Sequence, residues 1–216
     1  MDTNQGYKNR ALASLSGKWD KAIIATIIYL IITIGVSQVI TIPFSSSIAG
    51  SGSASFLWTV LCFPLLWGYT VFFLNIIREK KIDWDSIFDG YKNGEWKRIG
   101  GTYLLYYIYV ILWTLLLIIP GIIKALSYSM TPYIMKDDSA ISGNAAIEKS
   151  MRMMDGHKMD LFWLYLSFIG WIILSIITFG IGFILLEPYM DSSVAHFYED
   201  LKKEHEGIKA EPAPAE

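Results

Sequence analysis

Long uncharged runs of apolar residues alternate with short charged segments along this chain. The first run, Ala22 to Ile42, has 21 residues and no charged side chain. Further runs begin near Phe56, Ile99 and Leu161. A helix that rises about 1.5 Å per residue needs about 20 apolar residues to cross a hydrocarbon core of about 30 Å. The pattern therefore predicts a membrane protein built from helices.

Two apolar runs contain residues that bend or end helices. Pro120-Gly121 divides one run, and Gly180-Ile181-Gly182 divides another. If both are kinks, the chain has four long kinked spans; if both are turns, it has six membrane-entering helices in three hairpins. Each returning piece has only about 15 residues, fewer than a full span needs. Whether these pieces cross, re-enter or lie at the interface stays open.

The distribution of positive charge favours the hairpins. In that arrangement all connections on the outer side lack Lys and Arg. The cytoplasmic side has four of these residues in the amino terminus, six in residues 78–98, four in residues 136–160 and three in the tail. Positively charged segments stay in the cytoplasm. We therefore expect an all-α polytopic protein of six membrane-entering helices, with short cytoplasmic interfacial helices and both termini cytoplasmic. In residues 78–98 we expect one such helix, with Trp84 and Phe88 buried.

A glycine precedes three of the predicted helices. Gly17, Gly94 and Gly156 each follow a short polar segment and stand just before an apolar run. Glycine adopts the left-handed conformation that lets a chain leave a helix and change direction. We expect this role at all three positions, as part of a weak internal repeat.

Three regions follow from the pattern. Residues 1–21 form a cytoplasmic segment with a short helix, residues 22–201 a single helical membrane domain, and residues 202–216 a charged, disordered tail. Near the end of the domain, an amphipathic helix is predicted by apolar residues on one face: Met190, Val194, Phe197, Tyr198 and Leu201.

Composition excludes several function classes. The chain is 53% hydrophobic and 18% charged with a net charge of -2, so it lacks the basic field that attracts nucleic acid. Its single cysteine and three histidines cannot form a closed Cys/His zinc site. No catalytic motif is recognisable, and we expect no metal, cofactor or catalytic residue.

Two places carry polar groups that need an explanation. Lys124 and Glu187 each follow a helix interruption inside apolar sequence, where a charge faces a cavity, pairs or reaches the interface. Their matched positions predict that they pair. His196, Glu199 and Asp200 share one helix face, which can hold a metal or a proton relay. The favoured interpretation of this cluster is a solvated face of an amphipathic helix.

Several short motifs follow one another along the chain in an order that is typical of one family. They are Pro120-Gly121, Tyr128-Ser129, Ala145 to Ser150, Gly156-His157-Lys158, Gly170-Trp171, Gly180-Ile181-Gly182, Pro188-Tyr189 and Phe197-Tyr198. In these motifs, over residues 100–201 and back to Arg10, the chain resembles the bacterial integral membrane family catalogued as domain of unknown function 975. The resemblance implies a multi-pass location in the bacterial cytoplasmic membrane and no particular activity.

These observations favour a non-enzymatic helical bundle that binds membrane lipid, a protein partner or a second copy of itself. A small-solute or ion transporter is the alternative, because the helices are broken and carry two charges. A membrane enzyme that acts on lipid headgroups depends on the His196 cluster alone. A transporter requires a polar stripe along several spans, and Ala22 to Ile42 offers only Ser37 and Gln38.

Overall fold

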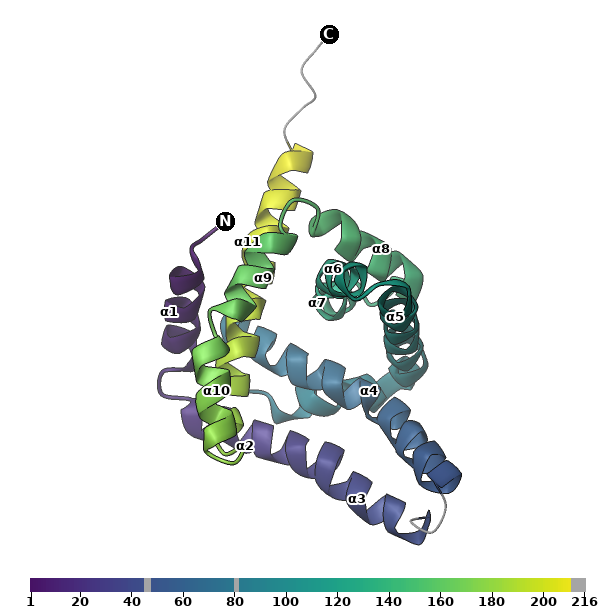
Figure 1. The fold of residues 1–216 in the computed structure, drawn as a ribbon. Coiled ribbons are helices and arrows are strands. Elements are labelled where there is room, and N and C mark those ends of the chain that lie inside the picture. The colour runs from purple at the N-terminus through teal and green to yellow at the C-terminus, as the bar shows by residue number, and fades with distance from the viewer. Residues whose placement is uncertain (45–47, 80–81, 211–216) are drawn as a thin grey trace.

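The computed structural model describes residues 1–44, 48–79 and 82–210, and its regular elements there are all helical (Figure 1). In chain order they are α1 (Asn4–Leu15), α2 (Trp19–Leu30), the π-helix η1 (Ile31–Gly35), α3 (Val36–Thr41), the 3₁₀ helix η2 (Ile42–Phe44), α4 (Ile48–Glu79), the 3₁₀ helix η3 (Trp84–Gly94), α5 (Glu95–Leu116), α6 (Ile118–Tyr128), α7 (Thr131–Asp137), α8 (Gly143–Met153), α9 (Lys158–Leu166), α10 (Ile169–Ile177) and α11 (Phe183–Ala210). The predicted all-α class is confirmed.

Four helical stretches among the described residues are long and apolar enough to cross a membrane. They are Trp19–Ile40, Gly52–Glu79, Glu95–Leu116 and Lys158–Ile177. Within a helix the backbone groups are satisfied internally, which a hydrocarbon environment demands. The fourth stretch is interrupted once, between α9 and α10. The apolar runs in the sequence therefore correspond to these four stretches.

The chain turns back at both interruptions. Leu117 is extended, with φ -160° and ψ 142°, and ends α5. A methyl group on Gly121 of α6 would overlap the backbone of Thr114 in α5, so these helices pack closely across the turn. Gly182 packs in the same way against Ser175 of α10. The hairpin interpretation holds, although the turn comes at Leu117 and Pro120 lies inside α6, which has 11 residues.

The three repeat glycines adopt the predicted left-handed conformation. Their φ angles are 72° at Gly17, 77° at Gly94 and 84° at Gly156. The helices α2, α5 and α9 begin within two residues of them. The predicted change of direction before these helices is confirmed.

The segment between α4 and α5 differs from the prediction in its buried face. Trp84 and Phe88 are 37% and 41% exposed, whereas Ile87 is 1% exposed. The backbone at Ile87 lies directly against Gly68 of α4, where any larger residue would collide with the Ile87 carbonyl. Because of this close approach, the Ile87 side chain points into the core and the side chains of Trp84 and Phe88 do not.

The helix α11 packs against α1, α4 and α2 (Figure 1). Of the predicted apolar face, Met190 is half-buried and the other four residues are buried: Val194, Phe197, Tyr198 and Leu201. The helix continues to Ala210, through part of the segment expected to be disordered. Contacts of Glu204 with the amino terminus at 3.9 Å and with His157 at 3.3 Å hold it there. Residues 211–216 of the predicted tail lie outside the described residues.

Candidate functional site

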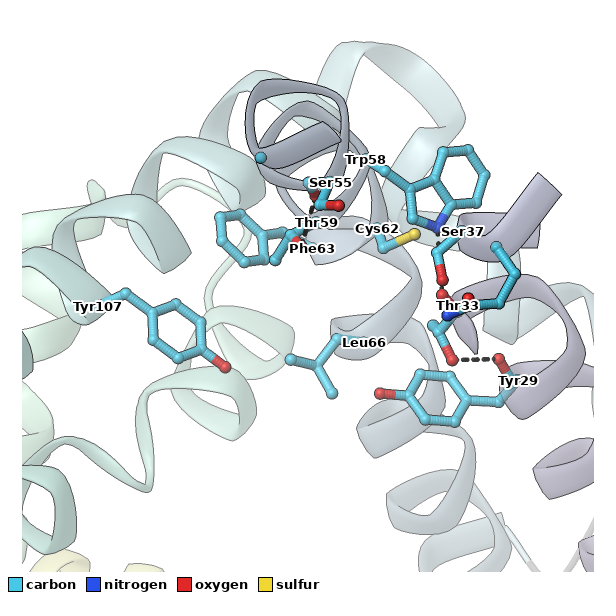
Figure 2. A pocket seen from close by; sticks show the side chains of 12 residues that line it. Tyr29, Thr33, Ser37, Ser55, Trp58, Thr59, Cys62, Phe63, Leu66 and Tyr107 are labelled. Carbon is cyan, nitrogen blue, oxygen red and sulfur yellow. Dashed lines mark hydrogen bonds between the residues drawn. The ribbon is translucent and has the colours of Figure 1, made fainter. Parts of the chain in front are cut away.

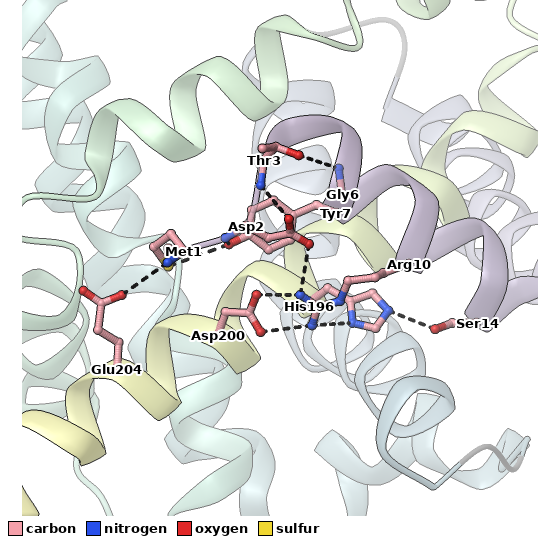
Figure 3. Close-up of polar contacts among 10 residues, drawn as sticks. All are labelled: Met1, Asp2, Thr3, Gly6, Tyr7, Arg10, Ser14, His196, Asp200 and Glu204. Atoms are coloured by element: carbon pink, nitrogen blue, oxygen red, sulfur yellow. Dashed lines mark hydrogen bonds and ion pairs between the residues drawn. The ribbon is translucent and has the colours of Figure 1, made fainter.

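His196 and Asp200 face α1 and not solvent (Figure 3). His196 is 8% exposed, and its Nε2 lies 2.9 Å from Oγ of Ser14. Arg10 donates to both oxygens of Asp200, at 2.5 and 3.0 Å. The solvated-face interpretation is therefore wrong for His196, because α1 covers it.

Glu199 belongs to a different group of contacts. It accepts a hydrogen bond of 2.7 Å from Arg78 at the end of α4. Arg78 also binds Asp137 of α7 at 2.5 Å, and Asp137 accepts from Tyr198 and Lys202, each at 2.7 Å. His196 and Asp200 thus share the partner Arg10, whereas Glu199 binds Arg78. Within residues 1–44, 48–79 and 82–210, no group of three or more His, Cys, Asp and Glu side chains could hold a metal ion.

Both groups of contacts shift a pKa. Burial, with the positive charge of Arg10, lowers the pKa of His196 to about 4, so its ring is neutral near pH 7. Burial alone would raise the pKa of Asp137, but hydrogen bonds from Arg78, Lys202 and Tyr198 outweigh it and lower the pKa to about 2. Each group is thus fixed in one protonation state by its structural contacts.

The predicted pair of Lys124 and Glu187 is not formed. The Lys124 ammonium lies 5.0 Å from the ring centroid of Trp113 and 3.9 Å from Sδ of Met151. No ion pair between described residues joins it to Glu187, which is half-buried on α11. Matched positions in successive hairpins do not bring two side chains together, because Lys124 finds an aromatic partner on its own hairpin.

Lys8 makes an intramolecular contact that the sequence did not indicate. Its ammonium donates to the carbonyl of Ser167 at 2.7 Å, at the break between α9 and α10. The same group lies 4.4 Å from the ring centroid of Phe168, and the residue is 8% exposed. A helix break leaves carbonyls without intrahelical partners. Lys8 therefore fixes this break, and its role is structural.

A polar cavity lies between α2–α3, α4 and α5 (Figure 2). Its volume is about 700 Å³. We call it the hydroxyl-lined pocket; it is lined by Tyr29, Thr33, Ser37, Gln38, Gly52, Ser55, Trp58, Thr59, Cys62, Phe63, Leu66 and Tyr107. Figure 2 shows Tyr107 on one side, Tyr29 and Thr33 on the other, and Leu66 between them. None of these lining residues carries a charge.

Helical spacing places the polar side chains on facing surfaces. Tyr29, Thr33 and Ser37 are four residues apart, and on α4 the polar residues Ser55, Thr59 and Cys62 repeat at three and four. Such residues share one helix face. These two stripes are the sequence signal for the pocket. Sequence reasoning missed them because it counted only Ser37 and Gln38 in the first apolar run and left out the hydroxyl groups of Tyr29 and Thr33.

A π-helix shapes one wall of the pocket. Within η1, the carbonyl of Thr33 accepts a hydrogen bond of 3.2 Å from the Trp58 indole, while its hydroxyl donates to the Tyr29 carbonyl at 2.7 Å. A π-turn displaces backbone groups from the regular ladder, and such turns recur at functional sites. The wide turn thus ties the first hairpin together at the pocket.

An apolar groove lies elsewhere, between α1, α2, α10 and α11. Its volume is about 600 Å³. Its lining residues are Leu12, Trp19, Trp171, Leu174, Ser175, Thr178, Ile181, Gly182, Leu185, Leu186 and Tyr189. The lining of the groove is thus mostly apolar, whereas that of the hydroxyl-lined pocket is rich in hydroxyl groups.

The comparisons with known proteins bear on the carboxyl-terminal half. No curated protein and no solved structure matches the chain. A family model matches from Thr102 in α5 to His205 in α11, which includes Tyr107 of the pocket but not its α2–α4 walls. Over residues 102–205, the chain resembles the family described as "Protein of unknown function (DUF975)".

Proposed function

We propose that this chain is an integral protein of the bacterial cytoplasmic membrane, with both termini in the cytoplasm. Four helical stretches long and apolar enough to cross a bilayer support the membrane location. Apart from Lys124, the Lys and Arg residues lie near the termini and in residues 78–98 and 136–160, which supports the orientation. The bacterial assignment depends on the family resemblance described above.

Within that membrane, the protein is a non-enzymatic binder of a small uncharged solute that carries hydroxyl groups. The hydroxyl-lined pocket is the observation that supports this function. Its hydroxyl and amide groups can donate and accept hydrogen bonds, and its aromatic rings can pack against a carbon skeleton. A charged ligand would lose its hydration without gaining a counter-charge, which costs several kcal/mol.

The single cysteine provides a direct test. Cys62 lines the pocket, so a bound solute should slow its reaction with a small thiol reagent. The purified protein is titrated with glycerol, erythritol and xylitol while the rate of Cys62 modification is measured. We expect the best of these polyols to slow the reaction several times in the wild type.

A matched pair of variants locates the binding. Thr33→Val removes a pocket hydroxyl and should weaken the protection of Cys62, whereas Thr114→Val removes a hydroxyl outside the pocket and should leave it unchanged. Rates that stay constant with every polyol, together with no small molecule retained in native mass spectrometry, would contradict the proposal.

Lipid binding is a second candidate, and the apolar groove favours it. The groove borders the interfacial helix α1 and the start of α2, where lipid chains and headgroups meet. Leu174 and Ile173 are neighbours that are 50% and 53% exposed, but only Leu174 lines the groove. Leu174→Ser should reduce the phospholipid retained in native mass spectrometry, and Ile173→Ser should not. A protein partner or second copy stays a prediction from the sequence.

A further inference from the structure

A second cavity lies next to the hydroxyl-lined pocket. Its volume is about 250 Å³. We call it the tyrosine chamber; it is lined by Leu66, Thr70, Thr102, Tyr103, Tyr106, Tyr107, Ser129, Thr131, Pro132 and Tyr165. Leu66 and Tyr107 line both cavities, so the two spaces meet at these side chains.

The two cavities follow one another along the same helices. On α4 the pocket is lined from Gly52 to Leu66, and the chamber continues to Thr70. On α5 the order is Tyr107 and then Thr102, toward the start of that helix. Since α4 and α5 each contain one of the stretches able to cross a membrane, the cavities are arranged along the crossing direction.

The boundary between the cavities consists of side chains that can move. The Phe63 ring stacks on Tyr107 with the centroids 5.4 Å apart and on Tyr103 at 5.7 Å. Tyr107 is 39% exposed, so its ring has space to turn. Exposed side chains change rotamer in picoseconds to nanoseconds. A rotation of Tyr107 with a shift of Leu66 would therefore join the two spaces without moving a helix.

The chemistry of the chamber matches that of the pocket. None of its described lining residues is charged, and hydroxyl groups and aromatic rings dominate. Its volume of about 250 Å³ corresponds to about eight water molecules at about 30 Å³ each. The chamber thus suits a small polyol and excludes a phospholipid.

We propose that a small uncharged polyol passes through the bundle, from the hydroxyl-lined pocket to the tyrosine chamber, and that Leu66 and Tyr107 form the gate between them. This inference rests on the proposed binding function and adds transport to it. Hydroxyl groups along both cavities would replace the hydration of the solute during passage. The absence of charge among the described lining residues makes the route selective against ions.

Osmotic swelling of vesicles tests the passage. The full-length protein is reconstituted into phosphatidylethanolamine–phosphatidylglycerol vesicles, which are mixed rapidly with glycerol, erythritol or xylitol while light scattering is followed. After the initial shrinkage, vesicles with protein should swell again several times faster than empty vesicles. The readout does not depend on the orientation of the protein in the vesicle.

Three variants examine the gate. Leu66→Trp fills the boundary and should return the swelling rate to that of empty vesicles. Leu57→Trp places the same group on α4 at a position that is 67% exposed and lines neither cavity, so swelling should persist. Tyr107→Ala removes the ring at the boundary and should accelerate swelling.

The outcomes separate passage from binding. Protection of Cys62 without faster swelling would overturn the passage and leave the binding proposal intact. Neither protection nor swelling would overturn both. Faster swelling that Leu66→Trp leaves unchanged would overturn this route through the bundle.

Discussion

One carboxylate joins three helices at the end of the bundle. Asp137 of α7 binds Arg78 of α4, and it also accepts hydrogen bonds from Tyr198 and Lys202 of α11. Its side chain is only 13% exposed. Charge-assisted hydrogen bonds are stronger than neutral ones, and a half-broken buried network leaves charges without partners. Asp137 therefore carries more stability than a surface ion pair would.

The lowered pKa of Asp137 predicts how stability depends on acid. The pKa falls from 3.8 to about 2 on folding, so the carboxylate stabilises the protein above pH 3.8, and this contribution is lost as the pH falls toward 2. The shift corresponds to about 2 kcal/mol. Thermal unfolding in detergent, measured from pH 6 to pH 2, should show this loss.

Asp137→Asn should lower the melting temperature at pH 6 and flatten its dependence between pH 4 and pH 2. Asp85, whose side chain is 86% exposed, provides the control, and Asp85→Asn should behave like the wild type. An unchanged acid dependence in Asp137→Asn would show that other carboxylates determine it.

At the scale of elements, the docking of α1 on α11 depends on a neutral histidine. His196 contacts Ser14 and Arg10 of α1, while Asp200 and Lys203 are the neighbouring charges on α11. In the folded protein the pKa of His196 lies at about 4, below its ordinary value of 6.5, because the ring is buried and the Arg10 charge is close. A state in which α1 has left α11 exposes the ring and so binds the proton more tightly between these values. Docking should therefore weaken as the pH falls from 6.5 to 4, by up to about 3 kcal/mol.

Hydrogen exchange of the α1 amides measures this docking. Their protection, corrected for the intrinsic effect of pH, should decrease between pH 6.5 and pH 4 while that of α4 stays constant. His196→Gln keeps a neutral hydrogen-bonding group and should remove the dependence. If the α1 amides of His196→Gln lose as much protection between pH 6.5 and pH 4 as those of the wild type, a group other than His196 causes the effect.

The left-handed glycines predict a second effect at this scale. Gly156 has φ 84°, and a methyl group at its Cα would meet no atom within 4 Å, so backbone strain alone opposes a side chain there. A left-handed non-glycine residue costs about 1 to 2 kcal/mol. Gly156→Ala should lower the melting temperature accordingly.

Gly170 provides the comparison for this substitution. It also has space around it, but it lies inside α10 without a positive φ. Gly170→Ala should leave the melting temperature unchanged or raise it, because alanine favours helix more than glycine does. Equal losses in both variants would contradict the role of the left-handed conformation.

At the scale of the whole molecule, the orientation proposed above predicts which sites an impermeant reagent reaches. In a Cys62→Ala background, single cysteines are placed at Ser53, at the start of the second spanning stretch, and at Asn144 in α8. In intact cells, only the cysteine at position 53 should react with an impermeant maleimide. Reaction at position 144 would show that α6 and α7 do not return the chain to the cytoplasm, as in the arrangement with four spans.

Some of this architecture could be predicted because it depends on local sequence. The length of an apolar run determines whether a helix can cross a membrane, and Gly94 or Gly156 determines where the chain changes direction. The turn at Leu117 could not be predicted, since nothing in a leucine favours an extended backbone and Pro120 three residues later drew the prediction away from it.

The sites depend on contacts between distant segments, which spacing alone does not determine. His196 and Glu199 share a face of α11, yet one contacts α1 and the other contacts α4. Spacing along a helix shows which side chains lie together but not which element covers them. The hydroxyl-lined pocket could not be predicted for the same reason. Its two polar stripes form a pocket only because α2 and α4 face each other.

The contact between α1 and α11 has a consequence for biogenesis. Arg10 and Asp200 are separated by 190 positions in sequence, and a ribosome adds about 5 to 20 residues per second. During synthesis, α1 therefore emerges many seconds before α11 has been made. Until then, Tyr7 and Lys8 lack the contacts that bury them in the folded protein. Closing so long a loop is entropically costly until the intervening helices are in place. Truncation before α11 should thus leave an inserted but unclosed chain, which quality-control proteases would recognise by its free amino-terminal helix.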